Sequence, residues 1–202
     1  IERMHMITYS LFRDTIHAIK EWDKELVISA ISLEEDIDQL AYLVLRIIRS
    51  ASINYRLANQ LNLDPLDSLD YQTLVHRIER VADHITNMAE CIKIMIENDE
   101  RLPAEAQRIL VEAAEIALSS YGKAVECYLY MDVEPTNGII DQQSEIEKLY
   151  SKITPLPRYG EIEDSQVLTH IITLRENILI VSNLAADIAE LTIDRAYKSE
   201  VI

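Results

Sequence analysis

The stretch that decides the fold is HRIERVADHITNMAE, residues 76–90, in which apolar side chains recur every three or four positions. The same spacing continues on both sides of it, through Leu74, Ile78, Val81, Ile85, Met88, Ile92 and Met95. This spacing puts the apolar side chains on one face of an α-helix. It predicts a helix over residues 71–98.

Helical periodicity continues through most of the chain. A 202-residue chain with only three glycines and five prolines is poor in the turn residues that an all-β fold needs. In the turn at 62–70 we expect Pro65 to end one helix and Ser68 or Asp70 to cap the next. The sequence therefore predicts an all-α, elongated helical bundle, with helices at 2–21, from an N-cap at Asp23 to Gln60, and at 71–98, 103–131, 139–153 and 165–197.

Similar segments recur in the two halves. Ile37-Asp38-Gln39-Leu40 resembles Ile146-Glu147-Lys148-Leu149, and NMAE at 87–90 resembles DIAE at 187–190, an offset of 187 − 87 = 100 residues. The simplest architecture is a three-helix unit repeated once. We predict one repeat over residues 1–100 and the second over residues 101–202.

The composition bounds the partners. A net charge of −16 opposes direct binding of nucleic acid and of anionic lipid. No apolar run is long enough to span a bilayer, so we expect no membrane insertion. Cys91 and Cys127 are predicted to be free, buried thiols in a reducing compartment. The chain starts at Ile1 rather than at Met, so we expect a further segment before it.

Two pairs of carboxylates share the spacing that puts side chains on one helical face: Glu34 with Asp38, and Glu79 with Asp83. Like charges at this spacing repel each other, and a cation between the two helices would offset the repulsion. Carboxylate oxygens suit magnesium, calcium or manganese, and also serve iron or zinc. The alternative is a solvated acidic face paired with nearby bases such as Arg80.

Residues 76–90 resemble the signature of the PhoU family of phosphate-uptake regulators, in which Glu-Arg-x-x-Asp-His is followed by Asn-x-Ala-Glu. LEEDIDQL, residues 33–40, is similar to the acidic motif on the preceding helix of that family. The segment from Asn62 to Tyr71 resembles an archaeal branch, in which an AbrB-like DNA-binding domain often precedes the PhoU region.

The resemblance implies two tandem three-helix PhoU-like repeats. It implies cytoplasmic regulation of phosphate uptake and phosphate homeostasis through contact with the ATPase of a phosphate ABC transporter, or with another regulatory protein such as a sensor kinase. We expect a non-enzymatic protein that acts as a homodimer. A preceding DNA-binding domain would add transcription regulation. The resemblance also implies iron or zinc, or another divalent cation, at Glu34, Asp38, Glu79 and Asp83.

The second half departs from the pattern. Aligned on the repeat, the four candidate ligands correspond to Gln143, Glu147, Leu179 and Asn183, so three of the four carboxylates are missing. We therefore predict one metal site, in the first half.

Two other functions remain open. A metal-free interaction module would use its acidic faces to bind a basic partner. A ferritin-like di-metal protein needs Glu-x-x-His on two helices. The chain has one such pair, Glu2 with His5, and an aspartate variant, Asp14 with His17. His84 is interpreted as a residue of the surface or of a helix interface.

Overall fold

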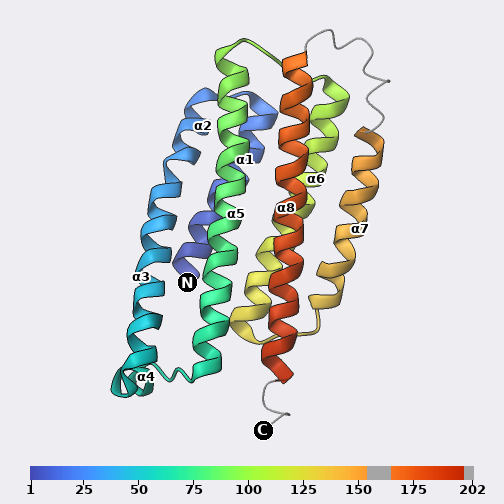
Figure 1. The fold of residues 1–202 in the computed structure, drawn as a ribbon. Helices are drawn as coiled ribbons and strands as arrows, with labels where there is room; N and C mark the ends of the chain where they lie inside the picture. Colours follow the sequence, from blue (N-terminus) through green and yellow to red (C-terminus); the bar gives the residue numbers. More distant parts are fainter. Residues whose placement is uncertain (154–164, 198–202) are drawn as a thin grey trace.

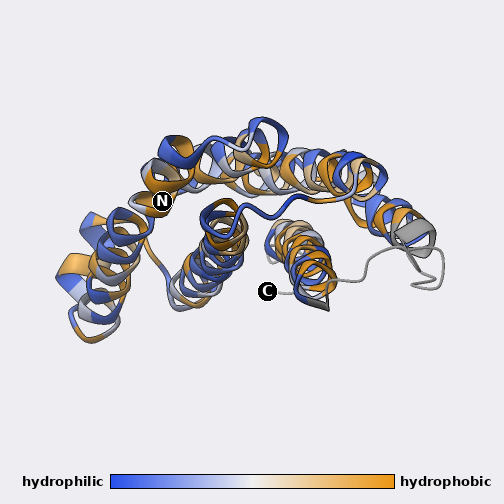
Figure 2. Ribbon diagram, turned by 90° about the horizontal axis from the view of Figure 1, so that it is seen from above, coloured by the Kyte–Doolittle hydropathy of each residue, from blue (hydrophilic) through white to orange (hydrophobic). Residues whose placement is uncertain are grey.

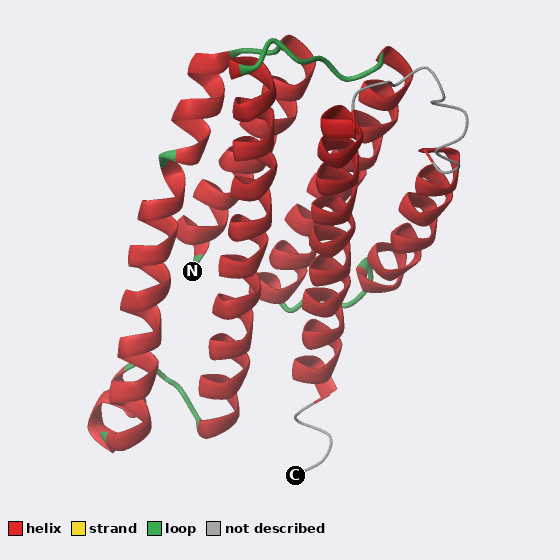
Figure 3. Ribbon diagram, turned by 45° about the horizontal axis from the view of Figure 1, so that its top comes forward, coloured by secondary structure: helices red, strands yellow, loops and turns green. Residues whose placement is uncertain are grey.

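The computed structural model describes residues 1–153 and 165–197, and within those ranges its regular structure is helical, with no strand (Figure 3). The all-α prediction is confirmed. Where six helices were expected, the described residues form α1 (Glu2–Glu21), α2 (Lys24–Ile31), α3 (Leu33–Ile53), α4 (Tyr55–Gln60), α5 (Pro65–Glu97), α6 (Ala104–Tyr130), α7 (Thr136–Ile153) and α8 (Ser165–Ala196).

The second predicted helix is interrupted twice. Its start is as expected, because the Asp23 side chain accepts hydrogen bonds from the backbone N–H groups of Glu25 and Leu26. A single helix to Gln60 is wrong, because breaks at Ser32 and Asn54 divide it into α2, α3 and α4. Asn54 is extended, with φ −129°, and its side-chain oxygen caps α4. An asparagine that bonds the backbone ahead of it competes with continued helix, although the apolar pattern runs on.

The start of α5 also differs from the prediction. We expected Pro65 to stop a helix and Ser68 or Asp70 to cap the next, but Pro65 is the first residue of α5. Asp64 and Asp67 form a capping box in which each side chain accepts from the other's backbone N–H. Proline suits this position because its fixed φ is helical and its missing N–H would have no partner there. Helix α7 likewise begins at Thr136 rather than at Ile139.

Two groups of three long helices make up the bundle. Helices α1, α3 and α5 pack on one another, and α6, α7 and α8 do the same. Figures 1 and 2 show the groups side by side, joined where α1 meets α6 and where α5 meets α8. One continuous core of buried side chains extends from Met4 to Leu191 across both groups. The predicted division at residues 100 and 101 falls in the loop between α5 and α6.

Both cysteines are buried and unpaired, as predicted. In the ranges 1–153 and 165–197, no helix combines the length and the apolar character required to cross a bilayer. The predicted loop around Pro155, Pro157 and Gly160 lies outside the described residues.

Candidate metal centre

The four predicted ligands lie on two neighbouring helices. Glu34 and Asp38 belong to the first two turns of α3, and Glu79 and Asp83 belong to the middle of α5, which packs against α3. The two helices run in opposite directions (Figure 1), so the beginning of α3 lies beside the second half of α5. The fold therefore brings together residues that are some forty positions apart in the sequence.

The electrostatics of Glu34 show that the two pairs act on each other. Its pKa is raised, first by partial burial and then by repulsion from Asp38, Asp83 and Glu90. Two of these three carboxylates come from α5. Their negative charges make it harder to place another one on Glu34.

The pKa of Asp83 is also raised by burial and by neighbouring carboxylates. Burial is the largest cause of its raised pKa, followed by repulsion from Asp38 and Glu79, and positive charge on Arg80 and His84 only partly opposes them. The structure thus groups all four predicted side chains into one acidic cluster. Glu90 is a fifth member that was not among the predicted ligands. The sequence signal for it was its place one turn beyond Asn87 on the same polar stripe.

The alternative of a neutralised acidic face is only partly realised. Glu79 pairs with His76 on its own helix, with His76 Nδ1 3.2 Å from Oε2. Arg80 acts on Asp83 at longer range, and within residues 1–153 and 165–197 no ion pair joins the two. Within the described residues, the repulsion that raises the pKa of Glu34 and Asp83 is therefore not removed by an ion pair.

In the second half, amides replace two of the four carboxylates, and Glu147 remains as the counterpart of Asp38. Gln143 of α7 aligns with Glu34, and Asn183 of α8 aligns with Asp83. The structure joins them directly, because Gln143 Nε2 donates to Asn183 Oδ1 over 3.1 Å. Two amides bond each other where two carboxylates repel each other in the first half. The second half thus satisfies this position with its own side chains.

The acidic cluster has the donor chemistry of a cation site but not its closed geometry. Carboxylate oxygens are the donors that hard divalent cations prefer, and they also serve iron and zinc. In the part of the chain that the structure describes, no three side chains of His, Cys, Asp or Glu converge as ligands of one ion. Binding would require the side chains of α3 and α5 to turn toward each other, which their surface position allows.

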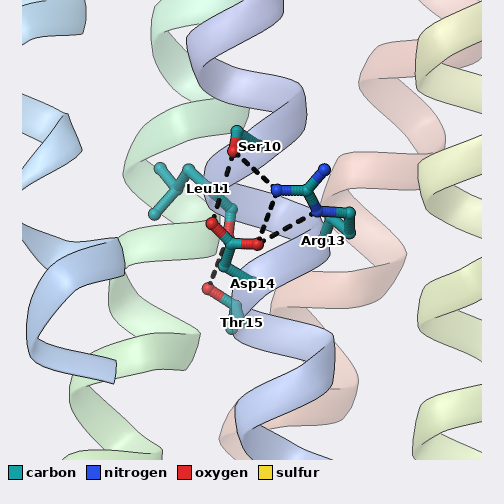
Figure 4. A network of polar contacts seen from close by, with 5 residues as sticks. All are labelled: Ser10, Leu11, Arg13, Asp14 and Thr15. Atoms are coloured by element: carbon teal, nitrogen blue, oxygen red, sulfur yellow. Dashed lines mark hydrogen bonds and ion pairs between the residues drawn. The ribbon is translucent and has the colours of Figure 1, made fainter. Parts of the chain in front are cut away.

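The ferritin-like pattern on α1 does not form a site. His5 is buried against the rings of Tyr9 and Tyr121, and burial lowers its pKa to about 4. Asp14 is occupied by its own helix (Figure 4): Arg13 Nε and Nη2 donate to it over 3.0 and 2.9 Å, and the Ser10 hydroxyl donates over 3.3 Å.

The interface between α5 and α8 is polar along part of its length. His84 Nδ1 lies 2.8 Å from Asn177 Oδ1, so the interpretation of His84 as a helix-interface residue is confirmed. Arg77 donates to the backbone carbonyl of Asp187. These contacts fix the rotation of α5, and with it the direction of the carboxylates that α5 carries.

A second polar cluster was missed by the sequence analysis. Cys91 Sγ lies 3.2 Å from His170 Nδ1, and His170 Nε2 lies 3.2 Å from Glu100 Oε2. Burial, followed by the charge of Glu100, raises the pKa of Cys91 to about 12. The thiol is therefore protonated at neutral pH and links α5 to α8 as a neutral hydrogen-bonding group. Cys91 and His170 are 79 positions apart, and no spacing rule connects them.

Comparison with known proteins agrees with the fold. Residues 1–92 match the model of the PhoU domain. Among solved structures, the fold is similar to PhoU from Pseudomonas aeruginosa, with a TM-score of 0.82 at 16% sequence identity, over 99% of this chain and 93% of that one. No curated protein matches the sequence. The domain match contains both acidic motifs, so the first 92 of the 202 residues are similar to a PhoU domain.

Proposed function

We propose that this protein regulates phosphate uptake and intracellular phosphate homeostasis by protein contact, as a cytoplasmic homodimer without catalytic activity of its own. The observation that carries the proposal is the PhoU domain match over residues 1–92, the part of the chain that holds the acidic cluster. The partner proposed is the ATPase of a phosphate ABC transporter, or a sensor kinase in the same response.

The acidic cluster supplies the contact chemistry. Its carboxylates lie on exposed or half-exposed positions of α3 and α5, where a partner can reach them. A basic surface on the partner, or a cation held between the helices, would relieve the repulsion that raises the pKa of Glu34 and Asp83. The strongly negative net charge favours basic protein surfaces over nucleic acid as partners of this region.

A pull-down tests the regulatory proposal. The transporter ATPase, immobilised, is incubated with this protein at high and at low phosphate. We expect retention that depends on phosphate and that weakens when Glu34 and Asp83 are replaced by Gln and Asn. A variant with two acids of the second half neutralised, Asp141→Asn and Glu145→Gln, serves as the control. Absence of retention at every phosphate concentration would overturn the transporter ATPase as the partner.

We further propose that the acidic cluster binds one divalent cation, iron or zinc being the first candidates, through Glu34, Asp38, Glu79 and Asp83. The support comes from the comparison of the halves: the amide pair Gln143–Asn183 needs no cation, whereas the matching carboxylates repel each other. A bound cation would neutralise the cluster and fix α3 against α5.

Elemental analysis of protein purified without chelator tests the cation. We expect one equivalent of metal in the wild type, and loss of most of it in Asp83→Asn but not in the second-half control. Equal metal content in all three proteins would place any metal elsewhere. A metal-free wild type that retains its partner would favour the metal-free interaction module instead.

A further inference from the structure

The outer face of α3 exposes an unusual number of apolar side chains. Tyr42, Leu43 and Ile47 are 66%, 53% and 40% exposed, and Ile53 at the end of the helix is 90% exposed. Leu43 and Ile47 are four residues apart and share one face of the helix, and Tyr42 directly precedes Leu43. Figures 1 and 2 show α3 at one edge of the bundle. Contiguous apolar surface of this kind on a water-soluble bundle marks an interaction site.

Helix α7 provides an internal comparison, because it occupies the opposite edge of the bundle (Figure 2). Up to Leu149, its large apolar side chains Ile139, Ile146 and Leu149 are buried, and Ile140 is half-buried. Its exposed positions in the same stretch are polar or charged, among them Asp141, Glu145 and Glu147. An edge helix in this fold therefore does not require an exposed apolar row, and the row on α3 has another cause.

The charges along α3 are segregated. Residues 34–38 contain four acids and no base, whereas residues 39–63 contain Arg46, Arg49 and Arg56 and no acid. All three arginines are exposed. In a chain of net charge −16, this is a local basic surface. It begins within the apolar row, because Arg46 precedes Ile47 and its guanidinium lies 5.7 Å from the centre of the Tyr42 ring. Along the helix, the face is therefore acidic at residues 34–38, apolar around Tyr42, Leu43 and Ile47, and basic from Arg46 onward.

Because its two ends have opposite charge, this face is complementary to the same face of a second copy rotated by 180°. When two such helices lie antiparallel, the acidic end of each meets the basic end of the other, and the apolar centres meet in the middle. Because the chain as a whole has a net charge of −16, two copies repel each other unless opposite charges meet at their contact.

We infer that the outer face of α3 is the homodimer interface, in which two copies of α3 pack antiparallel. Tyr42, Leu43 and Ile47 pack at the centre, and Glu35 and Asp36 of each copy lie near Arg46 and Arg49 of the other. The inference rests on the proposed homodimer and names its surface. A helix of 21 residues is about 30 Å long, so the contact is small and the dimer dissociates measurably on dilution.

A charge-swap experiment tests this interface. One variant carries Arg46→Glu and Arg49→Glu, and the other carries Glu35→Arg and Asp36→Arg. In either variant alone, like charges meet at both ends of the helix pair. Sedimentation velocity over a dilution series should then show a dimer dissociation constant at least tenfold above that of the wild type. In an equimolar mixture opposite charges meet at both ends again, and a heterodimer should form with affinity close to that of the wild type.

The control is Asp141→Arg with Glu145→Arg on α7, which changes charge by the same amount at the other edge and should leave the dimer unchanged. All four substituted residues on α3 are exposed, and circular dichroism checks that the variants fold. A dimeric wild type with unaffected swap variants overturns this interface but leaves the homodimer standing. A wild type that is monomeric at every concentration overturns both. If the wild type is monomeric and binds anionic vesicles, and the variant with Arg46→Glu and Arg49→Glu does not bind them, the face is assigned to lipid.

Discussion

The hydrogen bond between Gln143 and Asn183 stands where the first half has the carboxylates Glu34 and Asp83, and replacing the two amides by acids tests the difference. Changing Gln143→Glu and Asn183→Asp together should recreate the repulsion of the first half in the second. The amide hydrogen bond, 3.1 Å long and partly exposed, contributes roughly 0.5 to 1 kcal/mol, at the low end of the usual range. Repulsion between the new carboxylates adds a few tenths of a kcal/mol. The total loss is therefore about 1 kcal/mol.

In a chain of this size a loss of 1 kcal/mol lowers the melting temperature by about 2–4 °C. Thermal unfolding followed by circular dichroism at pH 7, with a chelator present, measures it. Near pH 3 both carboxyl groups are protonated and can bond each other, so the difference from the wild type should shrink. The variant Gln60→Glu with Gln72→Glu adds two charges at exposed sites as a control. A melting temperature unchanged at pH 7, or lowered equally at pH 3, would refute the reasoning.

Three further results are expected. Arg195 lies 4.8 Å from the ring centres of both Tyr71 and Tyr128, and its Nη2 donates to the Tyr71 hydroxyl over 3.0 Å. Arg195→Ala should therefore lower the free energy of unfolding, measured in urea, by about 2–4 kcal/mol, and a loss below about 1 kcal/mol would contradict this packing. Asp83 has a raised pKa, so its charged form destabilises the fold above that pKa. With a chelator present, Asp83→Asn should raise the melting temperature at pH 7. The gain should vanish below about pH 3.5, where the carboxyl is protonated in both folded and unfolded chains. Cys91, with a pKa of about 12, should react with a disulfide reagent at pH 8 only at the rate of unfolding, and fast labelling of the folded protein would show an accessible thiolate.

The long periodic segments were predictable because local spacing determines them. Helix α1 begins and ends where the sequence indicated, and the apolar row of α5 is buried from Leu74 to Met95. The breaks at Ser32 and Asn54 were not predicted, because the apolar pattern continues through both. Only the Asn54 side chain, bonded to the backbone of α4, decides the second break. Proline can end a helix or occupy its first position, so Pro65 alone does not distinguish the two. The capping box at Asp64 shows that Pro65 begins α5.

In the candidate site, too, the pattern within one helix was predictable and the contacts between helices were not. Glu34, Asp38, Glu79 and Asp83 could be proposed because each pair lies within one helix at a fixed spacing. That α3 and α5 bring the two pairs together requires the tertiary fold. The contact of Cys91 with His170 joins residues that no local rule relates, and so does the bond between Gln143 and Asn183. Cation binding itself remains a prediction.

The shared core between the two helix groups limits how a chain of this kind can shorten. The PhoU domain match ends at residue 92, inside α5, whereas α1 and α5 depend on α6 and α8 to cover their apolar sides. A gene truncated after the first half would encode a bundle with part of its interior open to water, prone to aggregate. The first half therefore needs the second to cover its core, through the buried side chains of α6 and α8. That covering depends on buried side chains, so the exposed side of α7 and α8 can carry the amide pair Gln143–Asn183 without opening the core.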